Sequence, residues 1–183
     1  MLRPLWRIEV SFVFSVIISF LIRVSLVALF LPFSALDKVL NPGAAVKQAE
    51  STVRSPTLGW MLIGTGMIIE VVMSAAIITG FFDRLAAVIL AGYCAVTALL
   101  WKQFWKIDDF RLKGPSKGRD VFWDFLKNFA VAGGFLILAT SGSAYGVRHL
   151  LLHPLSSTHP YGTVPLALHA LSASAATPAG VSQ

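Results

Sequence analysis

The chain has 183 residues, of which 56% are hydrophobic and only 13% are charged, and its mean hydropathy is +0.73. These values exclude a water-soluble globular domain. The net charge is +6, but most of the basic residues stand beside apolar runs, which indicates membrane topology and not nucleic-acid binding. The single cysteine, Cys94, excludes an intrachain disulfide and a thiolate metal cluster.

The first predicted membrane span is the apolar run 10–33, which contains Arg23 as its only charge. At a rise of about 1.5 Å per residue this run reaches about 36 Å, which is enough to cross a hydrocarbon core of roughly 30 Å. A cleaved signal peptide is the rival interpretation, because Arg3 and Arg7 precede the run. The run is too long for the apolar part of a signal peptide, so we favour a membrane helix.

The next two predicted spans form an antiparallel hairpin. Residues 58–82 contain one charge, Glu70, and the third span covers residues 85–104. Only Asp83 and Arg84 lie between these two apolar runs. A connection this short requires the second and third helices to be antiparallel neighbours.

The fourth predicted span covers residues 125–147, with Lys127 and Asn128 in its first turn. The mixed-charge segment 106–124 before it predicts an interfacial helix. Residues 149–183 are rich in Ser, Ala, Thr and Pro and predict a low-complexity, disordered tail. The predicted fold class is therefore all-α: an integral membrane four-helix bundle over residues 1–148, followed by this tail.

Charge predicts the orientation of the bundle. The loops after the first and third spans, with the start of the fourth, carry ten of the fourteen Lys and Arg residues outside the spans. By the positive-inside rule these long loops face the cytoplasm, and both termini lie on the opposite side.

Arg23 and Glu70 are the candidates for a polar site inside the membrane. Each lies near the middle of its predicted span, so we expect the two side chains to meet at similar depth. A charge at the bilayer centre costs about 2.5–3.5 kcal/mol, so both should face the bundle interior. The pair then forms a site for a quinone, a small polar ligand or a proton, or it is an ion pair that only fixes helix register.

The sequence constrains the roles of the remaining polar residues less closely. Lys127 either binds an anionic headgroup or acidic partner or extends to the interface to orient its helix. Asn128 needs a hydrogen-bond partner where its helix enters lipid, so a ligand or conformational role stays open. All four histidines follow the fourth span in a spacing that matches no compact ligand set, so the sequence predicts no metal site and no haem site.

Several of these residues stand in a pattern that resembles the DoxX family of small four-span membrane proteins, across about residues 20–143. The order and spacing of the pieces carry the resemblance: Arg23 with the apolar stretch after it, Asp37-Lys38, Glu70, the hairpin segment 80–87, Phe125-Leu126-Lys127-Asn128, Gly133-Gly134 and Ser141-Gly142. Arg23, Glu70, Lys127 and Asn128 match the family's polar positions, and Arg84 matches its turn residue.

The resemblance implies a multi-pass protein of the bacterial inner membrane, related to the membrane subunit of thiosulfate:quinone oxidoreductase. It implies a membrane subunit or accessory protein of a quinone-linked redox system, with quinone as the ligand to test. The expected partners are membrane lipid, a redox protein and a second copy of the chain. A non-enzymatic small-molecule or proton carrier and a membrane assembly factor stay open as alternatives. If the chain takes part in catalysis, it does so as an oxidoreductase subunit and not as an autonomous enzyme.

Overall fold

The computed structural model describes residues 5–53, 55–140, 144–157 and 161. Within these residues every regular element is a helix: α1 (Leu5–Val27), the π-helical turn η1 (Leu29–Ser34), α2 (Ala35–Leu40), α3 (Pro42–Val53), α4 (Pro56–Thr79), α5 (Asp83–Trp101), the 3-10 turn η2 (Phe104–Lys106), α6 (Lys117–Thr140) and α7 (Ala144–Leu152). Four stretches are long and apolar enough to cross a membrane: Val13–Leu40, Pro56–Thr79, Asp83–Lys106 and Lys117–Thr140. The predicted all-α, four-span architecture is confirmed.

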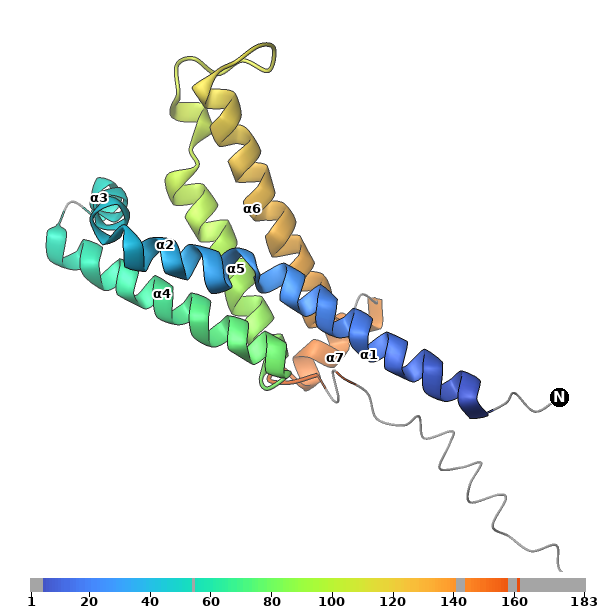
Figure 1. The fold of residues 1–183 in the computed structure, drawn as a ribbon. Helices are drawn as coiled ribbons and strands as arrows, with labels where there is room; N and C mark the ends of the chain where they lie inside the picture. The colour runs from blue at the N-terminus through green and yellow to red at the C-terminus, as the bar shows by residue number, and fades with distance from the viewer. Residues whose placement is uncertain (1–4, 54, 141–143, 158–160, 162–183) are drawn as a thin grey trace, which may run out of the picture.

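The helices pack as two crossing pairs. Figure 1 shows α5 and α6 side by side, running across α1 and α4. Small buried residues, which let helices approach closely, include Ala87, Ala91 and Ala98 on α5 and Ala139 on α6. Phe135, which is fully buried, fills the core between them.

The first span is kinked at Pro32. Proline lacks a backbone N–H and disfavours a helical conformation in the residue before it. Leu31 accordingly has φ −121° and ψ 108°, outside the helical region. The chain resumes as α2, which continues the direction of α1 along α4 (Figure 1). This bend places polar residues of the first span over the middle of α4.

The α4–α5 hairpin turns within three residues. Gly80 ends α4 with φ 79°, a left-handed conformation that favours glycine, and its N–H donates to the carbonyl of Ala76 at 3.0 Å. Phe82 also has a positive φ, 53°, and α5 begins at the next residue, Asp83. The tight turn buries Asp83 and Arg84 at the base of the hairpin, where both are less than 5% exposed.

The segment 106–124, expected to form an interfacial helix leading into the fourth span, is a loop over residues 107–116 and forms the first turns of α6 from Lys117. That helix is continuous from Lys117 to Thr140. Phe122 and Phe125 on α6 pack against Phe104, with ring centroids 5.0 and 5.4 Å apart. This aromatic cluster packs the chain before the loop against α6. Phe122 therefore lies within the α5–α6 hairpin.

Asp109 caps the start of α6. Its carboxylate accepts hydrogen bonds from the backbone N–H groups of Gly118 and Lys117, both at 2.9 Å. These two bonds hold the pKa of Asp109 below its ordinary value of 3.8. Because the folded-state pKa is the lower one, the cap stabilises the helix above pH 3.8 and loses this effect as the pH falls through the lowered pKa.

We therefore expect Asp109→Asn to speed hydrogen exchange of the Lys117 and Gly118 amides at neutral pH. In the wild-type protein, acidification through the lowered pKa of Asp109 should reduce the protection of these amides relative to their intrinsic exchange rate at the same pH, since protonation removes the acceptor charge. The measurement is hydrogen exchange read by mass spectrometry over residues 117–120. Asp108→Asn removes an exposed neighbouring carboxylate and serves as the control. Unchanged protection in Asp109→Asn would contradict the capping role.

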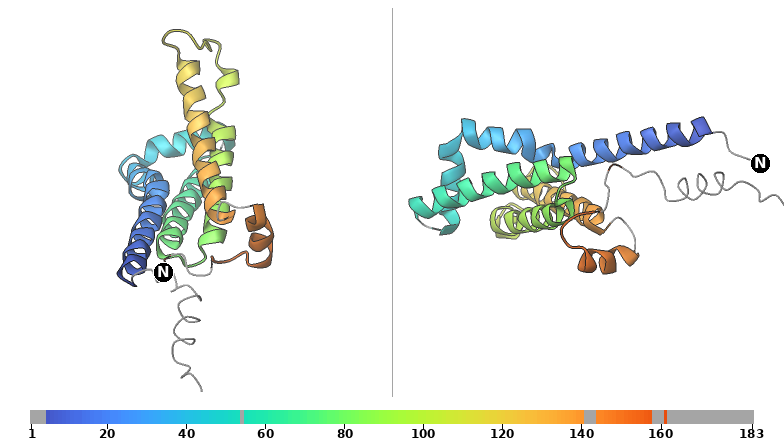
Figure 2. Two further views of the ribbon diagram at one scale, coloured as in Figure 1. Left: turned by 90° about the vertical axis from the view of Figure 1, so that its right-hand side faces the viewer. Right: turned by 90° about the horizontal axis from the view of Figure 1, so that it is seen from below.

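The beginning of the expected tail is helical and packs against the hairpin. Helix α7 runs from Ala144 to Leu152, and the backbone N–H of Leu85 donates to the carbonyl of Leu155 at 3.3 Å. Figure 2 shows α7 beside the α4–α5 end of the bundle. The remainder of the predicted disordered tail, apart from Tyr161, lies outside the described residues from 158 onward.

Candidate functional site

The expected pairing of Arg23 with Glu70 is wrong, because each of them has another ion partner. Arg23 contacts Asp83, with 2.7 Å between Nη2 and Oδ2. Glu70 contacts Lys38, with 2.7 Å between Nζ and Oε1. The interior of the protein therefore holds two separate polar clusters where the sequence predicted one pair.

The first cluster, here called the Glu70 cluster, consists of Ser34, Lys38, Glu70 and Tyr93. The Lys38 ammonium reaches both carboxylate oxygens of Glu70, at 2.7 and 2.8 Å, and donates to the Ser34 hydroxyl at 2.6 Å. The Tyr93 hydroxyl donates to Oε1 at 2.7 Å, and the Ser34 hydroxyl donates to the same oxygen at 3.2 Å. Glu70 is only 2% exposed. A carboxylate inside the membrane is thus neutralised by one cation and surrounded by three groups that carry exchangeable protons.

Three elements position these side chains. Glu70 lies on α4 and Tyr93 on α5, while the kink at Pro32 places Ser34 and Lys38 one helical turn apart on the first span. A glycine leaves room for the phenol, since a Cβ at Gly66 would lie 3.0 Å from the Tyr93 hydroxyl. Phe30 packs edge-on against the Tyr93 ring, with centroids 6.2 Å apart. The cluster therefore has polar groups on one side and aromatic rings on the other.

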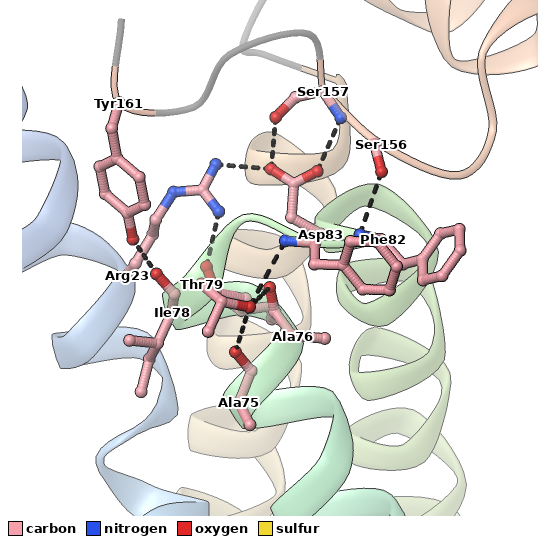
Figure 3. A network of polar contacts seen from close by, with 12 residues as sticks. Arg23, Ala75, Ala76, Ile78, Thr79, Phe82, Asp83, Ser156, Ser157 and Tyr161 are labelled. Carbon is pink, nitrogen blue, oxygen red and sulfur yellow. Dashed lines mark hydrogen bonds and ion pairs between the residues drawn. The ribbon is translucent and has the colours of Figure 1, made fainter.

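The second cluster, here called the Asp83 cluster, consists of Arg23, Asp83 and Ser157, and Figure 3 shows it. Arg23 Nη1 donates to the carbonyl of Ile77 at 2.7 Å. The backbone N–H of Ser157 donates to Asp83 Oδ1 at 2.6 Å, and the Ser157 hydroxyl contacts Oδ2. Asp83 thus joins the first span, the hairpin turn and the C-terminal segment at one point.

Further contacts hold the C-terminal segment against the hairpin. The Ser156 hydroxyl accepts from the N–H of Phe82 at 3.0 Å, and Tyr161 contacts the carbonyl of Ile78 (Figure 3). Arg84, predicted as the turn residue, lies 2.7 Å from Nδ1 of His149 and donates to the carbonyls of His149 and His153 at 3.2 Å. Arg84 therefore anchors α7 to the hairpin.

Lys127 and Asn128 lie away from both clusters. Lys127 is 74% exposed and contacts Asp124 at 3.4 Å, while Asn128 donates to the carbonyl of Asp124 in its own helix at 2.9 Å. Lys102 at the end of α5 contacts the same Asp124 at 3.0 Å. The Lys102–Asp124 contact joins the end of α5 to α6, whereas these contacts of Lys127 and Asn128 stay within α6, and the structure does not bring either residue to Arg23 or Glu70.

Sequence reasoning missed Lys38, Tyr93 and Asp83 as members of the clusters. Two signals could have found Lys38 and Asp83: Pro32 predicts a break in the first span before Lys38, and Asp83 begins a helix after an unusually short turn. Across residues 5–53, 55–140, 144–157 and 161, no three His, Cys, Asp or Glu residues gather closely enough to hold a metal ion. The chemistry available at the Glu70 cluster is that of hydrogen bonding and proton transfer.

Comparisons with known proteins give two matches, one to a family model and one to a bacterial membrane protein. Residues 18–103 match the family model described as DoxX. The Escherichia coli protein named "Inner membrane protein YphA" is 28% identical over 120 residues, which cover 66% of this chain and 79% of that protein. No solved structure matches. The Arg23–Asp83 and Lys38–Glu70 ion pairs lie within the residues that the family model matches. Lys127 and Asn128 lie beyond those residues.

Proposed function

Because this chain belongs to the DoxX family over residues 18–103 and is a multi-pass inner-membrane protein, we propose that it is a membrane subunit of a quinone-linked redox system. In this proposal the Glu70 cluster binds the quinone headgroup and transfers protons to or from it. The electrons come from a partner redox protein. The chain therefore acts as a subunit and not as an autonomous enzyme.

The observation that supports this proposal is the composition of the Glu70 cluster. Reduction of a quinone consumes protons as well as electrons, and a membrane-embedded site needs groups that deliver protons away from water. Tyr93, Lys38 and Ser34 all direct hydrogen-bond donors at one carboxylate in the bundle interior. Phe30 packs against Tyr93 and against Phe135, with ring centroids 5.9 Å apart in the second pair, so buried aromatic rings keep this side of the cluster apolar.

The same proposal assigns the sides of the membrane. We place the α2–α4 connection and the α5–α6 loop in the cytoplasm, because these segments, together with α2 and the first half of α6, carry ten of the chain's fifteen Lys and Arg residues. The α4–α5 turn and the Asp83 cluster then face the opposite side. The Glu70 cluster lies between these two ends of the bundle.

The test is binding of a short-chain quinone to the purified protein in lipid nanodiscs. We expect Glu70→Gln and Tyr93→Phe to weaken binding at least about tenfold, since each removes a hydrogen-bonding group at the headgroup. Asp108→Asn removes an exposed carboxylate and should bind like the wild type. Mass spectrometry of quinone extracted with each variant gives a second readout. Equal binding by wild type and both site variants would contradict the proposal.

A proton carrier is the second candidate, favoured by the position of Lys38 beyond the kink. Protonation of Glu70 removes the charge that holds Lys38, and the kinked segment carrying Lys38 is then free to move. This function requires proton flux without quinone. Proteoliposomes with a trapped pH-sensitive dye would show flux that Glu70→Gln abolishes and Asp108→Asn leaves unchanged.

A further inference from the structure

Two buried polar atoms, the Ser74 hydroxyl on α4 and Nε of Arg23 in the Asp83 cluster, have no hydrogen-bond partner among the described residues. Ser74 is 0% exposed and Arg23 is 4% exposed. A buried polar group without a partner costs about 1–3 kcal/mol, so proteins satisfy such groups with ordered water where space allows.

The hydroxyl of Ser74 differs from three threonine hydroxyl groups on the membrane-spanning helices. Thr79 donates to the carbonyl of Ala75 at 2.9 Å, Thr97 to that of Cys94 at 3.0 Å, and Thr140 to that of Leu136 at 2.9 Å. These bonds back to the same helix are the usual way to satisfy a hydroxyl in an apolar helix. Ser74 makes no such bond, so its hydroxyl is available to another group in the bundle interior.

Ser74 lies on the face of α4 that carries both clusters. Glu70, Ser74 and Ile77 are all buried and stand at positions i, i+4 and i+7. The Ile77 carbonyl accepts from Arg23. At about 1.5 Å per residue, Ser74 is about 6 Å along the helix from Glu70 and about 4.5 Å from Ile77. One water molecule spans about 5.6 Å between two hydrogen-bonded groups, which is comparable to these separations along the helix.

The groups at both ends have unused hydrogen-bonding capacity. Glu70 Oε1 accepts from Ser34, Lys38 and Tyr93, whereas Oε2 accepts from Lys38 alone among the bonds described. A carboxylate oxygen can accept two hydrogen bonds. At the other end, Nε of Arg23 still has its N–H to donate.

We propose that Ser74 and Arg23 bind ordered water in the bundle interior, and that this water joins the Glu70 cluster to the Asp83 cluster in one hydrated track. The track runs along the inner face of α4, from the middle of the membrane to the α4–α5 turn. It would supply protons to Glu70 from the side of the turn. Only this use of the track rests on the proposed function, because the binding of water does not depend on quinone.

The first test measures the exchange of a buried thiol with heavy water. Cys94 is a natural control, since it is 0% exposed and belongs to the apolar core. We expect the thiol of Ser74→Cys, in a Cys94→Ala background, to exchange its S–H at least about tenfold faster than the Cys94 thiol of the wild-type protein. Infrared absorption of the S–H group reads both rates. Equally slow exchange at the two positions would overturn the proposal.

The second test uses the unmodified chain and does not depend on a variant that folds. A wild-type structure at a resolution that shows water should contain a water molecule within hydrogen-bond distance of Ser74 Oγ and a second near Nε of Arg23. Direct bonds from these atoms to protein groups, with no water between Glu70 and Arg23, would overturn the proposal.

The outcomes separate this inference from the proposed function. A hydrated track in a protein that binds no quinone would contradict the quinone-linked function and leave the track standing. Quinone binding that requires Glu70, together with slow exchange at position 74, would contradict the track and leave the quinone-linked function standing.

Discussion

Lys38→Ala should lower the free energy of unfolding by about 3–5 kcal/mol, the usual cost of removing one member of a buried ion pair. Glu70 is 2% exposed, and Lys38 is its cationic partner. Without the ammonium, a carboxylate remains in the membrane interior with only the Ser34 and Tyr93 hydroxyl groups as donors. Thermal unfolding of the detergent-purified variant, followed by circular dichroism, measures the effect.

Two comparisons make this result specific to the ion pair. Lys47→Ala removes an exposed lysine from α3 and should leave the unfolding temperature nearly unchanged. The double variant Lys38→Ala with Glu70→Gln should recover part of the loss, because a neutral amide costs less to bury than an unpaired carboxylate. A double variant as unstable as Lys38→Ala alone would show that the lysine stabilises the protein through packing and not through its charge.

Asp83→Asn should destabilise the protein by a similar amount, about 3–5 kcal/mol, since it leaves the Arg23 guanidinium buried without a counter-ion. Arg23 and Asp83 are 4% and 1% exposed, so solvent gives the charge little compensation. The substitution keeps the shape of the side chain. Any loss of stability therefore reports on charge and hydrogen bonding.

The same substitution should release the C-terminal segment. Ser157 contacts both carboxylate oxygens of Asp83, and an amide can accept at only one of these positions. Limited proteolysis should cut Asp83→Asn after Leu155 or Tyr161 faster than it cuts the wild type. Asp108→Asn is the matched control on an exposed loop. Equal cleavage rates in all three proteins would show that the other contacts of the segment are sufficient to hold it.

The helices were predictable because their signal lies in local composition. A run of apolar residues long enough to span the bilayer admits few other structures, so four spans follow directly from the sequence. Boundaries were less accurate where packing decides them. The start of α6 is placed by tertiary contacts, since Phe122 and Phe125 pack against Phe104, which lies before the loop.

The polar pairing was harder to predict because it depends on how far each helix is shifted along its neighbour. Counting residues placed Arg23 and Glu70 at equal depth, but this assumed straight helices that enter the membrane together. The kink at Pro32 brings Lys38 to Glu70. Arg23 instead reaches the hairpin turn, where the buried Asp83 needs a cation. Sequence identified two intramembrane charges correctly and could not assign their partners.

The spacing of these partners along the chain sets the order in which they can meet during synthesis. A ribosome delivers the chain from its N-terminus, so each contact waits for its later member. Lys38 and Glu70 are separated by 32 positions, Arg23 and Asp83 by 60, and Asp83 and Ser157 by 74. The Lys38–Glu70 ion pair can therefore form once α4 has inserted, and Tyr93 completes the Glu70 cluster only when α5 follows. The charge on the nascent first span stays without its carboxylate until α5 begins to emerge, and the C-terminal segment completes the Asp83 cluster last.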